Sequence, residues 1–100
     1  MQHKLTLSWI EQNFDKYNKE FWNGTLRKPN FQVCKTKSLL GQFNHRTWTL
    51  RISNYFDRSE KDFANTLIHE MIHLYFQSKA DWKEGHGRKF QAMARTFDKY

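Results

Sequence analysis

The segment His69-Glu70-Met71-Ile72-His73 constrains this 100-residue chain more than any other part of it. Residues four positions apart lie on the same face of a helix, so two histidines at this spacing can reach one tetrahedral Zn²⁺ together. Glu70 is rotated about 100° from His69 around the helix axis, near such a metal but off the ligand axis. The pattern H-E-x-x-H therefore predicts a zinc site in which Glu70 acts as general base.

The residues around this pattern favour one helix over residues 62–76. At about 100° per residue, the apolar side chains gather on one broad face and the polar ones on the opposite side. The apolar face holds Ala64, Leu67, Ile68, Met71, Leu74 and Tyr75, and the polar stripe holds Asp62, Thr66, His69, Glu70 and His73. We expect a mostly buried helix whose polar side carries the metal site.

A catalytic zinc usually has three protein ligands and one open position for water. His86 is the preferred third ligand, because Gly85 and Gly87 beside it make a tight turn of the backbone easy. Glu84 is the alternative, as in zinc enzymes that combine the same helix motif with a downstream glutamate. Zinc is the expected metal because the donor set is rich in nitrogen.

Length and composition predict one domain over residues 1–100. Seventeen Lys and Arg against ten Asp and Glu give a net charge of +7, and the basic residues are dispersed. Such a surface is compatible with weak, salt-sensitive contact with DNA. No apolar stretch is long enough for a membrane span, and the first residues lack the apolar region of a signal peptide. The single cysteine, Cys34, excludes an internal disulfide, and we expect a cytoplasmic protein.

The remaining elements follow from periodicity. Ser8 and Glu11 form a capping-box signature, and apolar residues at helical spacing predict a first helix over residues 9–22, ended by Asn23-Gly24. Alternation predicts strands at 31–35 and 47–52 and a weaker strand at 38–43, interrupted at Gly41. A turn is expected at 44–46, so the strands form a small antiparallel meander. Trp48, Leu50 and Ile52 fall on one face of the last strand.

Two helices complete the predicted α+β fold. Ser59 followed by Asp62 is a second capping signal, placed where the metal helix should begin. Phe90, Met93 and Phe97 recur at helical spacing and predict a C-terminal helix over residues 88–98.

The motif His69-Glu70-x-x-His73, followed by Gly85-His86-Gly87-x-x-Phe90, resembles the SprT-like metalloprotease family, which includes the Spartan proteases. Residues 21–26 and 47–52 are also similar to that family, so the resemblance covers nearly the whole chain. It implies a zincin-like minimal metalloprotease domain with His69, His73 and His86 as zinc ligands and Glu70 as catalytic base. It also implies proteins crosslinked to DNA as a substrate class, with DNA as an activator.

The expected reaction is hydrolysis of peptide bonds in a protein or peptide substrate. Glu70 takes a proton from the zinc-bound water and returns it to the leaving amine, while strand 47–52 is the candidate to pair with an extended substrate. A second group that stabilises the tetrahedral intermediate is left open among Tyr55, Tyr75, His45 and Arg51. The alternative, motivated by the charge and the aromatic content, is a DNA-binding module with a structural or degenerate zinc site.

Overall fold

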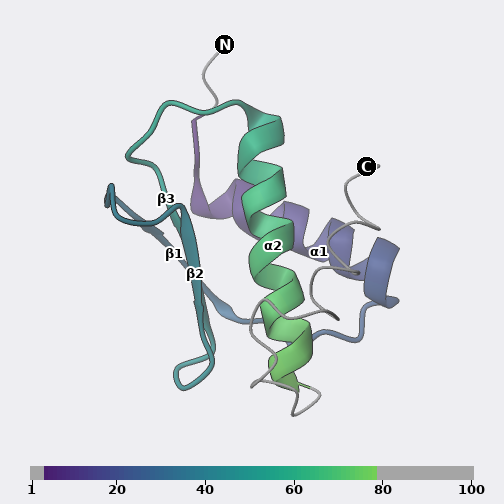
Figure 1. Cartoon of the computed structure of the whole chain (residues 1–100). Coiled ribbons are helices and arrows are strands. Elements are labelled where there is room, and N and C mark those ends of the chain that lie inside the picture. Colours follow the sequence, from purple (N-terminus) through teal and green to yellow (C-terminus); the bar gives the residue numbers. More distant parts are fainter. Residues whose placement is uncertain (1–3, 79–100) are drawn as a thin grey trace.

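The structure is a computed structural model, and it describes residues 4–78. Its elements follow the order α1 (Leu7–Trp22), β1 (Asn30–Cys34), β2 (Gly41–Asn44), β3 (Thr49–Ser53) and α2 (Glu60–Ser78). Both helices lie on the same side of the sheet, and α1 crosses behind α2 in Figure 1. The α+β architecture predicted from the sequence is confirmed. The predicted C-terminal helix at 88–98 lies outside the described residues.

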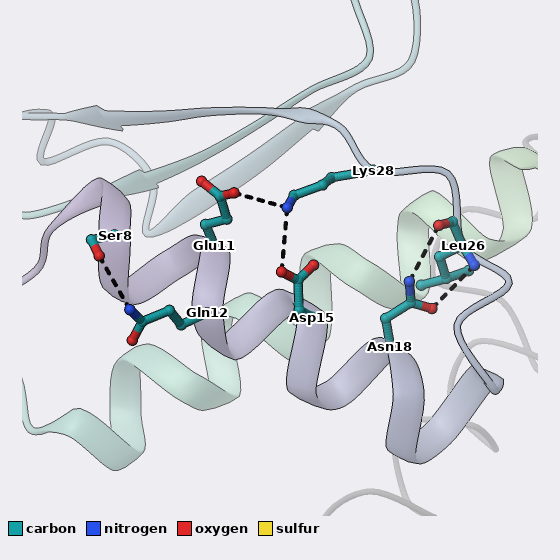
Figure 2. Close-up of polar contacts among 7 residues, drawn as sticks. All are labelled: Ser8, Glu11, Gln12, Asp15, Asn18, Leu26 and Lys28. Atoms are coloured by element: carbon teal, nitrogen blue, oxygen red, sulfur yellow. Dashed lines mark hydrogen bonds and ion pairs between the residues drawn. The ribbon is translucent and has the colours of Figure 1, made fainter.

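Helix α1 begins two residues before its predicted start. Thr6 has extended backbone, and its Oγ1 accepts a hydrogen bond from the backbone N–H of Trp9 at 3.0 Å. Ser8, the expected cap, lies inside the helix, where its Oγ accepts a hydrogen bond from the side chain of Gln12 at 3.4 Å (Figure 2). The predicted capping box is therefore wrong, because Thr6 presents a capping hydroxyl two residues earlier.

The end of α1 is fixed by left-handed backbone and by one buried amide. Asn23 and Gly24 have φ angles of 54° and 75°, which confirms the predicted stop. The side chain of Asn18 donates to the carbonyl of Leu26 at 3.2 Å and accepts from its N–H at 3.1 Å (Figure 2). The loop after the helix is thereby held against the helix that precedes it.

Lys28 joins the same loop to α1 from the solvent side. Its Nζ lies 2.9 Å from a carboxylate oxygen of Glu11 and 3.3 Å from one of Asp15 (Figure 2). All three side chains are exposed, so these ion pairs contribute little stability compared with the buried Asn18 amide.

The sheet has the order β1-β3-β2 and is mixed. β1 and β3 are parallel, with Phe31 opposite Leu50, while β2 and β3 are antiparallel, with Phe43 opposite Leu50. The predicted antiparallel meander is therefore wrong for the β1–β3 pair. Alternation along a strand decides which residues face the core, but it carries no information on strand order or direction. Cys34 ends β1 as a half-buried free thiol.

Trp48 does not lie in a strand with Leu50 and Ile52, as the alternation predicted. It ends the turn between β2 and β3 with a φ of 52°. Its indole N–H donates to the carbonyl of Arg27 at 3.0 Å, and its ring packs edge-on against Phe43 with centroids 5.0 Å apart. The turn is therefore longer than predicted, because the left-handed backbone at Trp48 delays the start of β3 until Thr49.

The two faces of the sheet differ in polarity. Leu50 and Ile52 point toward the helices and are fully buried, and Phe31 packs edge-on against Phe14 of α1 with centroids 5.3 Å apart. Each large side chain buried there stabilises the fold by about 1.5–3 kcal/mol. The opposite face of the sheet is polar, and the register places Gln32, Arg51 and Gln42 in one row across it.

Neither helix in the described part of the chain is long and apolar enough to cross a bilayer.

Candidate metal centre

Helix α2 begins directly after Ser59, the predicted cap, and extends two residues beyond each end of the predicted range 62–76. The hydroxyl of Ser59 accepts a hydrogen bond from the N–H of Asp62 at 3.2 Å, and its carbonyl accepts from the N–H of Phe63 at 3.1 Å. Glu60 and Asp62 place negative charge in the first turn, where the helix dipole favours it. The metal motif therefore lies well inside a capped helix rather than at a frayed end.

The predicted apolar face of α2 is buried, but the predicted polar stripe is not an open surface. Thr66 and Glu70 are only 7% and 6% exposed. They are buried because β2 lies against this side of the helix. His69 and His73 are half-buried. From residue 66 to residue 76 every side chain of the helix is thus buried or half-buried, and the two motif imidazoles keep partial access to solvent.

The two motif histidines lie next to each other on successive turns of α2. Their ring centroids are 5.2 Å apart and the ring planes make an angle of 74°. Neighbouring imidazoles on a helix are a donor set that suits Zn²⁺. Residues 4–78 contain no group of three or more His, Cys, Asp or Glu side chains placed so that they could hold a metal ion. His86 and Glu84 lie outside the described residues, so the identity of the third ligand stays a prediction.

Glu70 is a buried carboxyl group with a raised pKa. Its burial removes water from the carboxylate and raises the pKa from 4.5 to about 7. A carboxyl group whose pKa lies near neutrality can accept and return a proton with little energetic penalty in either direction.

A hollow of about 360 Å³ connects this carboxyl group to solvent. It lies between the middle of α2 and the start of β2, and it is lined by Leu40, Gly41, Asn65, Thr66, His69 and Glu70. The sequence did not predict that the start of β2 forms one wall of this hollow. The available signal was the glycine within a strand pattern, because an internal glycine marks a close approach of two backbones.

The strand beside the hollow is β2, an edge strand of the three-stranded sheet. The predicted substrate strand, 47–52, corresponds to β3, which is paired on both sides. Since a paired strand has no free backbone groups along its edges, the prediction that this segment pairs with a substrate is wrong. β2 is the strand that offers an edge next to the motif helix.

None of the four residues considered as a second stabilising group lines this hollow. Arg51 lies on the opposite face of the sheet, where its Nε and Nη2 donate to the side-chain oxygen of Gln32 at 3.1 and 2.9 Å. His45 lies in the turn at the far end of β2 from Gly41. Tyr75 packs against Trp22 at a centroid distance of 6.2 Å. Tyr55 is exposed and packs edge-on against Phe56 at 4.9 Å.

The described residues form a two-helix, three-stranded α+β domain with a histidine pair on one helix. The crystal structure of the metallopeptidase zymogen jannalysin from Methanocaldococcus jannaschii has this fold, with a TM-score of 0.68 and 23% sequence identity. The match covers 97% of this chain and 82% of that chain. A search of curated proteins found no match. The sequence model of the SprT-like family matches residues 10–100, and the chain therefore belongs to the SprT-like family.

Proposed function

We propose that this protein is a zinc-dependent peptidase in which Glu70 acts as general base. The observation that carries the proposal is the pairing of two adjacent imidazoles with a buried carboxyl group beside an open hollow. Zinc bound by His69, His73 and a third ligand would act as a Lewis acid and lower the pKa of water. Family membership and the fold shared with a metallopeptidase support this assignment.

Glu70 carries the proton steps. In its ionised form the carboxylate accepts a proton from the water that attacks the peptide carbonyl. The same carboxyl group then donates this proton to the nitrogen of the leaving amine, so that the group is regenerated. The burial of this carboxyl group beside the hollow supports this role, because a pKa near neutrality suits a group that first accepts and then returns a proton.

The edge of β2 is proposed to hold the substrate. An extended peptide can add a strand to a free sheet edge through main-chain hydrogen bonds, which bind many sequences equally well. Leu40 lies at the start of this edge, lines the hollow and is 45% exposed. It offers an apolar contact to a substrate side chain next to the bond that is cleaved.

Metal dependence tests the proposal. The protein is stripped with a chelator, incubated with an unfolded protein such as casein, and the peptides are counted by mass spectrometry with and without one equivalent of zinc. We expect cleavage only with zinc. His69→Ala at the same zinc concentration is the matched control and should give no cleavage. Cleavage that survives chelation, or its absence from fully zinc-loaded protein, would contradict the assignment.

The second candidate function, DNA binding, is favoured by the distribution of charge. Residues 21–56, which include the whole sheet, contain six Lys and Arg and no Asp or Glu. The sheet face turned away from the helices surrounds a hollow of about 400 Å³ with polar side chains: Gln32, Gln42, Asn44, Thr47, Thr49 and Arg51. We propose that DNA contacts this polar face, where Arg51 supplies a positive charge, and that DNA-associated proteins are the substrates.

Charge reversal separates this contact from a general effect of net charge. Lys35→Glu with Lys37→Glu, next to β1, should weaken binding to a short labelled DNA strand and reduce its salt dependence. Lys16→Glu with Lys19→Glu, on α1, is the matched double reversal and should have a smaller effect. Equal losses for both pairs in fluorescence anisotropy would reject the sheet face as the contact. Tight DNA binding without any protein cleavage would favour the binding-module alternative.

A further inference from the structure

Gly41 lies where β2 meets α2, in a space that admits no side chain. A Cβ added there would be 2.8 Å from Cγ2 of Thr66 and 3.3 Å from Cγ of Glu70. It would also be 3.3 Å from the carbonyl oxygen of Arg51 on the neighbouring strand. Carbon atoms at optimal separation are about 3.5–4.0 Å apart, so the first of these contacts is a clash. The strand and the helix are therefore closer than any residue other than glycine permits.

The side chain of Thr66 cannot easily move away to relieve such a clash. Its hydroxyl donates a hydrogen bond to the carbonyl of Asp62 at 3.2 Å, and the residue is buried. A β-branched side chain on a helix has few χ1 choices, and rotation would break this hydrogen bond. The methyl group of Thr66 is thus held against Gly41. A side chain at position 41 would push on the helix face that carries both Thr66 and Glu70.

Thr66 and Glu70 are four residues apart and share one face of α2. Both pack against the same glycine, one through Cγ2 and the other through Cγ. Because Gly41 has no side chain, Glu70 can lie deep between α2 and β2. His69 lines the same hollow, but none of the three atoms nearest to a Cβ at position 41 belongs to it.

We propose that Gly41 is a positioning residue for Glu70, acting through the close contact of β2 with Thr66. This inference rests on the proposed role of Glu70 as general base. It predicts that a methyl group at position 41 displaces the carboxyl group while the metal-binding histidines stay in place. It further predicts that removing the opposing methyl group from Thr66 restores the position.

The test uses Gly41→Ala, Thr66→Ser and the double variant. Thr66→Ser removes only Cγ2 and keeps the hydroxyl that bonds to Asp62. For Gly41→Ala we expect kcat to fall by roughly ten- to a hundred-fold, since misplacement by about 1 Å has effects of this size. Zinc affinity should change by less than about threefold, because the histidines stay in place. The double variant should regain most of the lost kcat. Loss of kcat below twofold in Gly41→Ala would overturn the proposal.

A second readout does not depend on activity. The side-chain methylene resonances of Glu70 are recorded by NMR in the metal-free wild type and in the three variants. Gly41→Ala should shift them, and the double variant should return them toward the wild-type position. Unshifted resonances in Gly41→Ala would overturn the positioning role even for an active enzyme. Shifted and rescued resonances in a protein without peptidase activity would uphold it and reject the proposed function instead.

Gly24→Ala is the matched control for the general cost of replacing a glycine. Gly24 has a φ of 75°, and a Cβ there would meet no atom within 4 Å. This substitution should lower the melting temperature through backbone strain, yet leave kcat of the folded protein and the Glu70 resonances unchanged. If it lowered kcat as much as Gly41→Ala does, the effect at position 41 would be one of stability, and the proposal would fail.

Discussion

The imidazole rings of His69 and His73 lie with their centroids 5.2 Å apart on successive turns of α2. A capped helix with buried neighbours on nearly all sides holds them in this relationship. The two candidate metal ligands are thus already placed side by side by the packed backbone, so that little ordering of these side chains would be needed for a metal to bind.

Zinc should stabilise the folded protein through these two side chains. A ligand at a hundred times its Kd adds about 2.7 kcal/mol to the free energy of unfolding, so the melting temperature should rise when zinc replaces the chelator. In His69→Ala and His73→Ala this rise should disappear. His45→Ala, in the turn beyond β2, is the control and should keep it. Calorimetry with and without zinc measures the effect, and an equal rise in all variants would exclude the pair as ligands.

The third ligand can be assigned without activity measurements. His86→Ala should weaken zinc binding by orders of magnitude, whereas Glu84→Ala should leave it close to the wild-type value, because three ligands are needed to hold a catalytic zinc firmly. Competition with a chromogenic chelator gives the two affinities. The reverse ranking would assign the site to the glutamate.

Burial of Glu70 should cost stability in the metal-free protein above neutral pH. Its pKa is raised from 4.5 to about 7, so between these values the folded state holds a proton that the unfolded chain has released. Stability therefore falls as the pH rises through this range. Glu70→Gln has no such titration and should be more stable than the wild type by about 1–3 kcal/mol at pH 8. Near pH 4 the two should differ little.

Urea unfolding in the presence of a chelator at several pH values tests this relation. A stability difference between Glu70→Gln and wild type that does not grow with pH would mean that the carboxyl group is not desolvated. Such a result would not bear on the proposal that His69 and His73 are metal ligands.

The buried amide of Asn18 should matter for stability and not for chemistry. Asn18→Ala leaves the N–H and the carbonyl of Leu26 without their partners, which should cost about 2–4 kcal/mol. Asn13 bonds only to the carbonyl of Trp9 within the same helix, so Asn13→Ala is a matched control with a cost below about 1 kcal/mol. Chemical unfolding measures the loss of stability in both variants. Equal losses would contradict the role of Asn18 in holding the loop against α1.

Local signals predicted the parts of the protein that depend on neighbouring residues in the chain. The motif helix and its Ser59 cap were predicted correctly, because capping and i, i+4 spacing are both encoded within a few residues. The cap of the first helix was misassigned because Thr6 and Ser8 both carry hydroxyl groups near its start.

Long-range relationships could not be predicted in the same way. The parallel β1–β3 pair and the edge position of β2 depend on how distant strands associate. This is why β3 was mistaken for the strand beside the substrate. Thr66 and Glu70 were expected on an open polar stripe, and only the approach of Gly41 explains their burial. The family resemblance, by contrast, was confirmed by the match over residues 10–100.

The most direct test compares wild type with Glu70→Gln in the same preparation conditions, measuring bound zinc and cleavage of an unfolded protein together. We predict one zinc per chain in both proteins, and cleavage that falls by orders of magnitude in the variant. A zinc-loaded Glu70→Gln that cleaves as fast as wild type would contradict the assignment of Glu70 as the base.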